Sequence, residues 1–323
     1  MAKARKRKPP PKKPAPRVPR ERVRPGLIVG VGLATVDLLC VAPRIDERLV
    51  ELSIFSMQGG GSVATALATV ATLGSKARLF GRLADDDFGR FVLGALRGLV
   101  DTSLVSVERG KFSPVSLVNI DELTRKRKIM FTRGSTTPLL PRDLPPRLLD
   151  GASLLIIDGY QPALQAAIAE KARAKGITVL LNAGHLVGGM GELLALSDIV
   201  IGSERFASEF APSDDVQKSL REITRIGPRV AVITMGEAGA MALEDRKLVQ
   251  QEAIDVFVAD TTGAGDVFCG AFAYASLQRW PLERALPFAN AAAGLTCRSL
   301  GAQSALPTLA EVQEAVLGGQ PRT

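Results

Sequence analysis

Predicted strands and helices alternate along the chain after residue 25. The apolar run at residues 27–32 ends in glycines and predicts a buried strand. Small apolar side chains recur at helical spacing over residues 62–73, and the following Gly74 is typical of a helix C-cap. The alternation continues from residue 150 onward, with predicted strands at residues 154–158, 177–181, 198–202 and 230–234.

This pattern predicts an α/β fold in which helices cover both faces of one mostly parallel sheet, giving three layers, α/β/α. Ligands in such folds bind at the carboxyl ends of the strands. A smaller sheet is predicted from residues 40–56 and 112–133, as a β lid that projects from the main body. Two strands alone are marginally stable, so the lid is expected to pair with further strands or with a partner subunit. A homodimer through the lid is therefore one alternative.

The positive charge of the chain is concentrated at its start. Residues 1–25 contain eleven Lys or Arg, one Glu and seven Pro, whereas the rest of the chain has a net charge of −2. Such a basic, Pro-rich segment has little to bury, and a disordered tail is predicted. The tail suits contact with nucleic acid or another acidic surface, and a plain solvated extension is the alternative. It has no apolar face, which disfavours an organelle transit peptide.

The histidine and cysteine content excludes several classes of site. His185 is the only histidine, which rules out His-dependent catalytic triads and His-rich metal sites. Three scattered cysteines without a CxxC pair fit free thiols in a reducing compartment. No apolar run of membrane-spanning length and no secretory signal pattern occurs, so no membrane partner and a cytoplasmic location are expected.

Residues 260–266, with the sequence DTTGAGD, carry the clearest chemistry. They precede an apolar helix over residues 267–277. Small residues at a helix start leave the backbone N–H groups uncovered, and together with the helix dipole these form an anion site. Asp266 falls in the first turn, where its carboxylate could accept a proton from an incoming hydroxyl. Phosphoryl transfer needs little beyond positioning, charge stabilisation and such a base.

The longer segment DTTGAGDVFCGAFAYA resembles the ATP-site motif of the PfkB (ribokinase-like) carbohydrate kinases, and the similarity extends over most of the chain after residue 26. The resemblance implies a ribokinase-like kinase domain over residues 26–315, with ATP as phosphoryl donor. It also implies that Asp266 is the catalytic base, and that the backbone of Gly263, Ala264 and Gly265 is the anion hole.

Other segments agree with this resemblance. The sequence TMGEAG at residues 234–239 is similar to the family's nucleotide loop and implies ATP contacts by Thr234, Gly236 and Gly239. Asn290 lies in a segment that resembles the family's helix beside the adenine, where it either faces the nucleotide or caps a polar patch. The resemblance further implies that Asp260, with backbone carbonyls of the loop at residues 301–303, could bind K⁺.

The predicted substrate residues lie near the N-terminal end. Asp37 follows the first strand, where the family places a sugar-binding aspartate, and a carboxylate can accept hydrogen bonds from two vicinal hydroxyls. Gly60 and Gly61 belong to a segment similar to the family's di-glycine substrate loop, in which glycine allows close backbone approach and lid motion.

The chain also departs from the ribokinase pattern. Thr35 and Ala64 stand where ribokinase-type members have asparagines that hold the substrate. Ser203 replaces the asparagine of the motif that organises Mg²⁺, which leaves Glu204 as its carboxylate. A Ser at this position and the sequence GGGSVATA make the chain similar to the ketohexokinase and sulfofructose kinase branch. Water-mediated Mg²⁺ binding is expected.

The lid is rich in basic residues. Positions 125–128 fit a solvated hairpin turn, whereas Arg133 at the strand end is the better candidate for an anionic group of the substrate. Three functions follow. The first is a kinase for a hydroxyl of a small-molecule sugar or polyol. The second is a nucleoside or sugar-phosphate kinase. The third is a catalytically silent sugar-binding regulator. The intact Asp266 argues against this third function, because a protein that only binds sugar has no use for a catalytic base.

Overall fold

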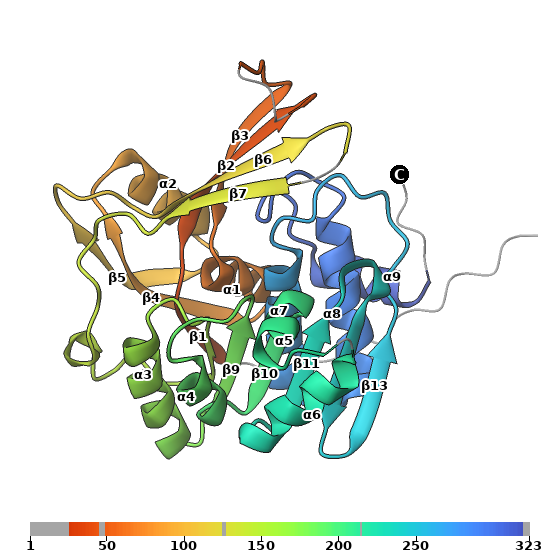
Figure 1. The fold of residues 1–323 in the computed structure, drawn as a ribbon. Helices are drawn as coiled ribbons and strands as arrows, with labels where there is room; N and C mark the ends of the chain where they lie inside the picture. The colour runs from red at the N-terminus through yellow and green to blue at the C-terminus, as the bar shows by residue number, and fades with distance from the viewer. Residues whose placement is uncertain (1–25, 45–48, 125–126, 214, 319–323) are drawn as a thin grey trace, which may run out of the picture.

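The structure is a computed structural model that describes residues 26–44, 49–124, 127–213 and 215–318 (Figure 1). The predicted basic tail, residues 1–25, lies outside the described residues, as do positions 125–126 of the lid turn. None of the helices in the described ranges is long and apolar enough to cross a membrane.

The main body is built on one large sheet. Within the described residues, nine strands pair in the order β13-β12-β11-β10-β9-β8-β1-β4-β5. All neighbours are parallel except β12 and β13, which add an antiparallel edge. The strands are β1 (Leu27–Val31), β4 (Lys76–Ala84), β5 (Asp101–Glu108), β8 (Ala152–Ile157), β9 (Thr178–Ala183), β10 (Ile199–Ser203), β11 (Val230–Thr234), β12 (Ala240–Glu244) and β13 (Lys247–Gln251).

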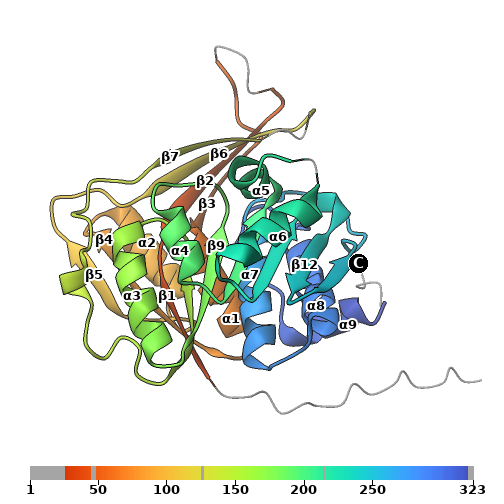
Figure 2. The same cartoon turned by 60° about the horizontal axis from the view of Figure 1, so that its bottom comes forward.

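Helices cover both faces of this sheet, which confirms the predicted α/β/α layers. Successive strand residues point to opposite faces, so Ile28 and Ile156 belong to one core cluster and Val29 and Ile157 to the other. The first cluster is covered by α1 (Ser62–Thr72), α2 (Asp87–Leu96), α7 (Ala264–Leu277), α8 (Leu282–Thr296) and α9 (Leu309–Val316). The second is covered by α3 (Pro162–Ala174), α4 (Met190–Ala195), α5 (Glu204–Phe210) and α6 (Val216–Ile226); Figure 2 shows α3, α4 and α6 side by side.

A second sheet lies above the carboxyl ends of the central strands (Figure 1). We call it the lid sheet, and its strand order is β3-β2-β6-β7. Its strands are β2 (Thr35–Ala42), β3 (Ile54–Gly60), β6 (Val115–Asp121) and β7 (Arg127–Thr132). The first lid strand begins earlier than residue 40, because β1 is followed after only three residues by β2. Asp37 is therefore carried by a lid strand.

Candidate active site

Two clefts meet at the start of α7. The first, of about 610 Å³, lies between the lid sheet and the carboxyl ends of the central strands, and we call it the lid cleft. The second, of about 600 Å³, lies between α7, α8 and the segment after β11, and we call it the α8 cleft. Gly263 and Asp266 line the lid cleft, whereas Ala264 and Gly265 line the α8 cleft. The predicted anion hole is therefore the boundary between the two.

Asp266 lies in the first turn of α7 and keeps part of its surface exposed to the lid cleft. Asn182, at the carboxyl end of β9, donates a hydrogen bond from Nδ2 to Asp266 Oδ1 over 2.9 Å. Loss of hydration by the surrounding protein raises the pKa of Asp266 to about 7; the Asn182 hydrogen bond opposes this shift, and the nearby Asp37 and Asp158 add to it. A carboxylate with a pKa near neutrality suits general-base work.

The backbone before Asp266 offers N–H groups to a ligand. Gly263 is the N-cap of α7 with φ 75°, a left-handed conformation that favours glycine. A Cβ at this position would meet Ala302 Cβ at 2.1 Å, so the position has no room for a side chain either. Within the described chain, no hydrogen bond uses the N–H of Gly263 or of Gly265. Both donors sit at the positive end of the helix dipole, which is an anion site.

Asp37 projects from β2 into the lid cleft and is buried. Thr35 Oγ1 donates to its Oδ1 over 2.6 Å. Burial raises the pKa of Asp37, whereas hydrogen bonds from Thr35 and Ser116 lower it. Gly60, on the neighbouring strand β3, makes room for the carboxylate, because a Cβ there would lie 2.2 Å from Asp37 Cγ. Gly61 follows at the N-cap of α1 and also lines the cleft.

Asp158, just after β8, is a cleft residue that the sequence analysis did not single out. Its carboxylate accepts hydrogen bonds from Leu33 N (2.8 Å), Tyr160 N (2.9 Å), Gln165 Nε2 (2.8 Å) and the Ser62 hydroxyl. These donors come from the segment after β1, from α1, from α3 and from the turn after β8 itself. Asp158 therefore connects the segments that form the floor of the lid cleft.

Arg133, predicted as an anion contact, lies at the end of the lid sheet and lines the lid cleft. Its Nη1 donates to the backbone oxygen of Tyr160 over 2.9 Å, and its guanidinium carbon lies 4.8 Å from the centre of the Tyr160 ring. His185 and Arg205 line the same cleft. The cleft thus carries basic side chains from the lid and from the main body.

The predicted nucleotide residues line the α8 cleft. Thr234, Gly236 and Gly239 lie at the end of β11 and in the turn that follows it. Asn290, on α8, lines the cleft as well, but its Nδ2 donates to the backbone oxygens of Gln251 (3.0 Å) and Glu252 (3.2 Å). Its amide N–H groups therefore hold the end of β13, and its oxygen is the atom that remains for a ligand.

The two predicted metal residues are not brought together. Glu204 is exposed at the first residue of α5 and lines neither cleft, whereas Asp260 is buried beside the anion hole. Among the described residues no cluster of three or more His, Cys, Asp or Glu could hold a metal ion. Asp260 pairs instead with Arg127 of the lid sheet, 3.8 Å away. Arg127 is therefore more than a solvated turn residue, because its guanidinium supplies a positive charge beside Asp260.

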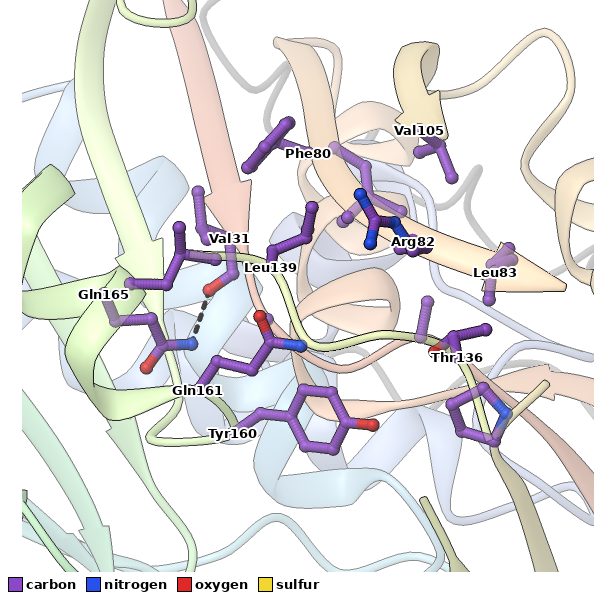
Figure 3. Close-up of a pocket in the computed structure, with 16 residues that line it drawn as sticks. Val31, Phe80, Arg82, Leu83, Val105, Thr136, Leu139, Tyr160, Gln161 and Gln165 are labelled. Atoms are coloured by element: carbon purple, nitrogen blue, oxygen red, sulfur yellow. Dashed lines mark hydrogen bonds between the residues drawn. The ribbon is translucent and has the colours of Figure 1, made fainter. Parts of the chain in front are cut away.

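A small cavity of about 20 Å³ lies between β1, β4 and α3, and Tyr160 lines both this cavity and the lid cleft (Figure 3). Gln165 Nε2 donates to Val31 O over 2.7 Å beside it, and Gln161 Oε1 is buried there without a partner in the described chain. A space of this size holds one water molecule, which suits the Gln161 oxygen.

Sequence reasoning did not identify Asn182, Asp158 or Arg127 as site residues. Asn182 and Asp158 carried a usable signal, since each is a polar residue at the carboxyl end of a buried strand, where ligands bind in this fold class. Arg127 carried none, because its contact depends on how the lid sheet is placed over the main body.

Known proteins share this architecture. Ribokinase of Arabidopsis thaliana, solved with ribose and ATP, aligns with a TM-score of 0.79 over 91% of this chain and 99% of that chain, at 23% identity. An E. coli structure solved with ATP and Mg²⁺ aligns with a TM-score of 0.80 over 91% of this chain and 99% of that chain, at 19% identity. At these identities the likeness shows the fold.

Sequence comparison is more specific. The chain is 28% identical to the ATP-dependent ribose-1-phosphate kinase of Halopiger xanaduensis, over 86% of this chain and 94% of that protein. It is 26% identical to the 5-dehydro-2-deoxygluconokinase of Geobacillus kaustophilus, over 92% of this chain and 95% of that protein. Residues 26–309 match the family described as pfkB family carbohydrate kinase. The chain therefore belongs to the pfkB family of carbohydrate kinases.

Proposed function

We propose that this protein transfers the γ-phosphoryl group of ATP to a hydroxyl of a sugar or sugar-like molecule. The observation that carries the proposal is the position of Asp266. Its carboxylate faces the lid cleft. Gly265, in the same helical turn, lines the α8 cleft, and its N–H has no partner in the described chain. A hydroxyl in one cleft and a phosphate chain in the other would meet at this turn.

The residues divide the work as follows. Asp37 accepts hydrogen bonds from substrate hydroxyls. Gly60 makes room for the Asp37 carboxylate, and Gly61 lets the substrate approach the backbone. Asp266 accepts the proton of the attacking hydroxyl. The backbone of Gly263, Ala264 and Gly265 holds the phosphoryl oxygens as their negative charge shifts, which is the main requirement of this reaction. Thr234, Gly236, Gly239 and Asn290 line the nucleotide side.

Mg²⁺ bound to the ATP phosphates would neutralise their charge. The described chain offers no multi-carboxylate cage, so the ion would be held by the phosphates and by water.

A charged substrate is a second candidate that a specific observation favours. Arg133, His185 and Arg205 line the lid cleft, and guanidinium groups recognise phosphate and carboxylate groups well. The similarity to a kinase named for ribose 1-phosphate agrees with a sugar phosphate as substrate. Arg133→Gln should then raise KM for the charged substrate, with little change in KM for ATP.

We also propose that the protein forms a homodimer through the outer face of the lid sheet. Met57 pairs with Leu38 and Met130 with Leu117 across the strands, so these apolar side chains share one face, and Met57 and Met130 are 40% and 47% exposed. Met57→Lys should convert the dimer to a monomer in light scattering. Leu317→Lys, at an exposed position just after α9, should leave the dimer intact.

The test of the proposed reaction is ATP consumption with Mg²⁺ across free sugars, sugar acids, sugar phosphates and nucleosides. Asp266→Asn should lower kcat by about 10²–10⁴-fold, the usual contribution of a general base. Glu170→Gln, an exposed carboxylate on α3, is the matched control and should leave kcat unchanged. An Asp266→Asn enzyme as active as the control would remove Asp266 from the mechanism.

A further inference from the structure

The Asp260 carboxylate is the most enclosed charge beside the anion hole. Its side chain is 0% exposed. Thr262 donates to Oδ1 from its backbone N–H (3.0 Å) and its hydroxyl (2.8 Å), and Gly301 N donates to Oδ2 over 2.9 Å. Neutral donors reduce the cost of burying a charge, and a nearby cation reduces it further.

That cation comes from the lid sheet. Arg127 Nη1 lies 3.8 Å from Asp260 Oδ1 and donates to Thr262 Oγ1 over 3.3 Å. It is the only ion pair that Asp260 makes within the described chain. Figure 1 shows the start of β7 above the C-terminal elements, so the contact joins two parts of the molecule that are far apart in sequence. The charge of Arg127 also affects Cys297 in the α8 cleft. Burial and the charge of Asp260 raise the pKa of the Cys297 thiol, whereas Arg127 lowers it.

One backbone carbonyl beside Asp260 is already occupied. The turn after α8 donates the Gly301 N–H to Asp260. The preceding carbonyl, Leu300 O, accepts from Gln58 Nε2 (2.7 Å) and Ser304 Oγ (2.6 Å), which uses both of its lone pairs. A second cation at Asp260 would also be repelled by the guanidinium.

We propose that Arg127 is the resident cation of this site and takes the place of a monovalent metal ion. Arg127 is also a positioning residue for the anion hole, a role that rests on the proposed function. It holds Thr262, whose neighbour Gly263 supplies the first free N–H of α7. It also shields the phosphates of ATP from the negative charge of Asp260. Nucleotide binding then needs no K⁺, and it depends on the lid strand that carries Arg127.

The experiment measures ADP affinity by calorimetry, with the full chain in KCl or in tetramethylammonium chloride at equal ionic strength. Affinity of the unmodified protein should agree within about twofold between the two salts. Arg127→Gln should weaken ADP binding about 5- to 30-fold in tetramethylammonium, the effect of one to two kcal/mol. Arg127→Lys should restore most of it. Lys128→Gln removes an adjacent charge from the same strand and should bind like the unmodified protein.

Either of two results overturns the inference. One is ADP binding by the unmodified protein that tightens tenfold or more in K⁺. The other is an Arg127→Gln protein that binds ADP as Lys128→Gln does. Neither result depends on finding the sugar, so a failure of the proposed substrate class is distinguished from a failure of the role of Arg127.

Discussion

Replacing the proposed base should make the protein more stable while it removes activity. Asp266→Asn deletes a charge that the fold disfavours, because the surrounding protein, Asp37 and Asp158 all oppose ionisation there. The change keeps the shape of the side chain, and an asparagine oxygen can still accept the hydrogen bond from Asn182. Any gain in stability therefore reports the cost of holding the base ready for use.

The size of the gain follows from the pKa. The pKa of Asp266 is raised from 3.8 to about 7, that is, by about three units. Below pH 3.8 the carboxyl is protonated in both the folded and the unfolded states. As the pH rises toward 7, the unfolded state releases the proton first, and the free energy of unfolding falls by about 1.4 kcal/mol per pH unit. Above pH 7 the loss is complete.

The difference in unfolding free energy between Asp266→Asn and the unmodified protein should therefore grow with pH. An ideally enclosed group would add about 3 kcal/mol between pH 5 and pH 8. Because Asp266 keeps part of its surface open to the lid cleft, we expect about 1–3 kcal/mol, since contact with solvent weakens electrostatic effects.

Urea unfolding at pH 5, 6, 7 and 8 measures this difference. Trp280, the only tryptophan, is partly buried against the core, with its ring centre 5.1 Å from that of Phe288 and 5.9 Å from that of Tyr274. Its fluorescence therefore reports unfolding. A difference that stays constant from pH 5 to pH 8 would refute the raised pKa and the reasoning built on it.

Three further predictions follow from the same turn of α7. First, kcat/KM should rise with pH and level off above about 7, because the base works only when deprotonated; a flat profile from pH 5 to 8 would contradict this. Second, Asn182→Ala should move the midpoint of this pH profile upward, since the Asn182 hydrogen bond lowers the pKa of Asp266. An unchanged midpoint would show that Asn182 does not set this pKa. Third, Gly263→Ala should cost about 1–3 kcal/mol of stability through its left-handed backbone and the clash with Ala302. Gly265→Ala, where a Cβ meets nothing within 4 Å, should leave the Tm unchanged.

The features that could be predicted from the sequence are those that short segments encode. The alternation of apolar runs and helical segments was enough for the α/β/α layers, because each strand and helix carries its own periodicity. The helix start at Gly263 and the neighbouring Asp266 could be recognised locally for the same reason. Their placement between two clefts is what the structure adds.

Contacts between distant segments could not be predicted in this way. Asn182 reaches Asp266 only because β9 ends beside the start of α7, 84 residues further along the chain. Arg127 reaches Asp260 only in one register of β7, since a shift by one residue would turn its side chain to the opposite face of the lid sheet. The composition of the lid turn, rich in basic residues, gave no indication of which one points inward.

The short link from β1 to β2 has a consequence for engineering. Only three residues separate the central strand from the lid strand that carries Asp37, so no long hinge lies between the scaffold and this contact. The apolar outer face of the lid, Asp37 and Arg127 all belong to one sheet. A chimera that received the lid of a relative would therefore exchange the proposed sugar contact, the proposed subunit interface and the partner of Asp260 in a single step. Grafts that leave Asp260 opposite a neutral residue should be the ones that fail.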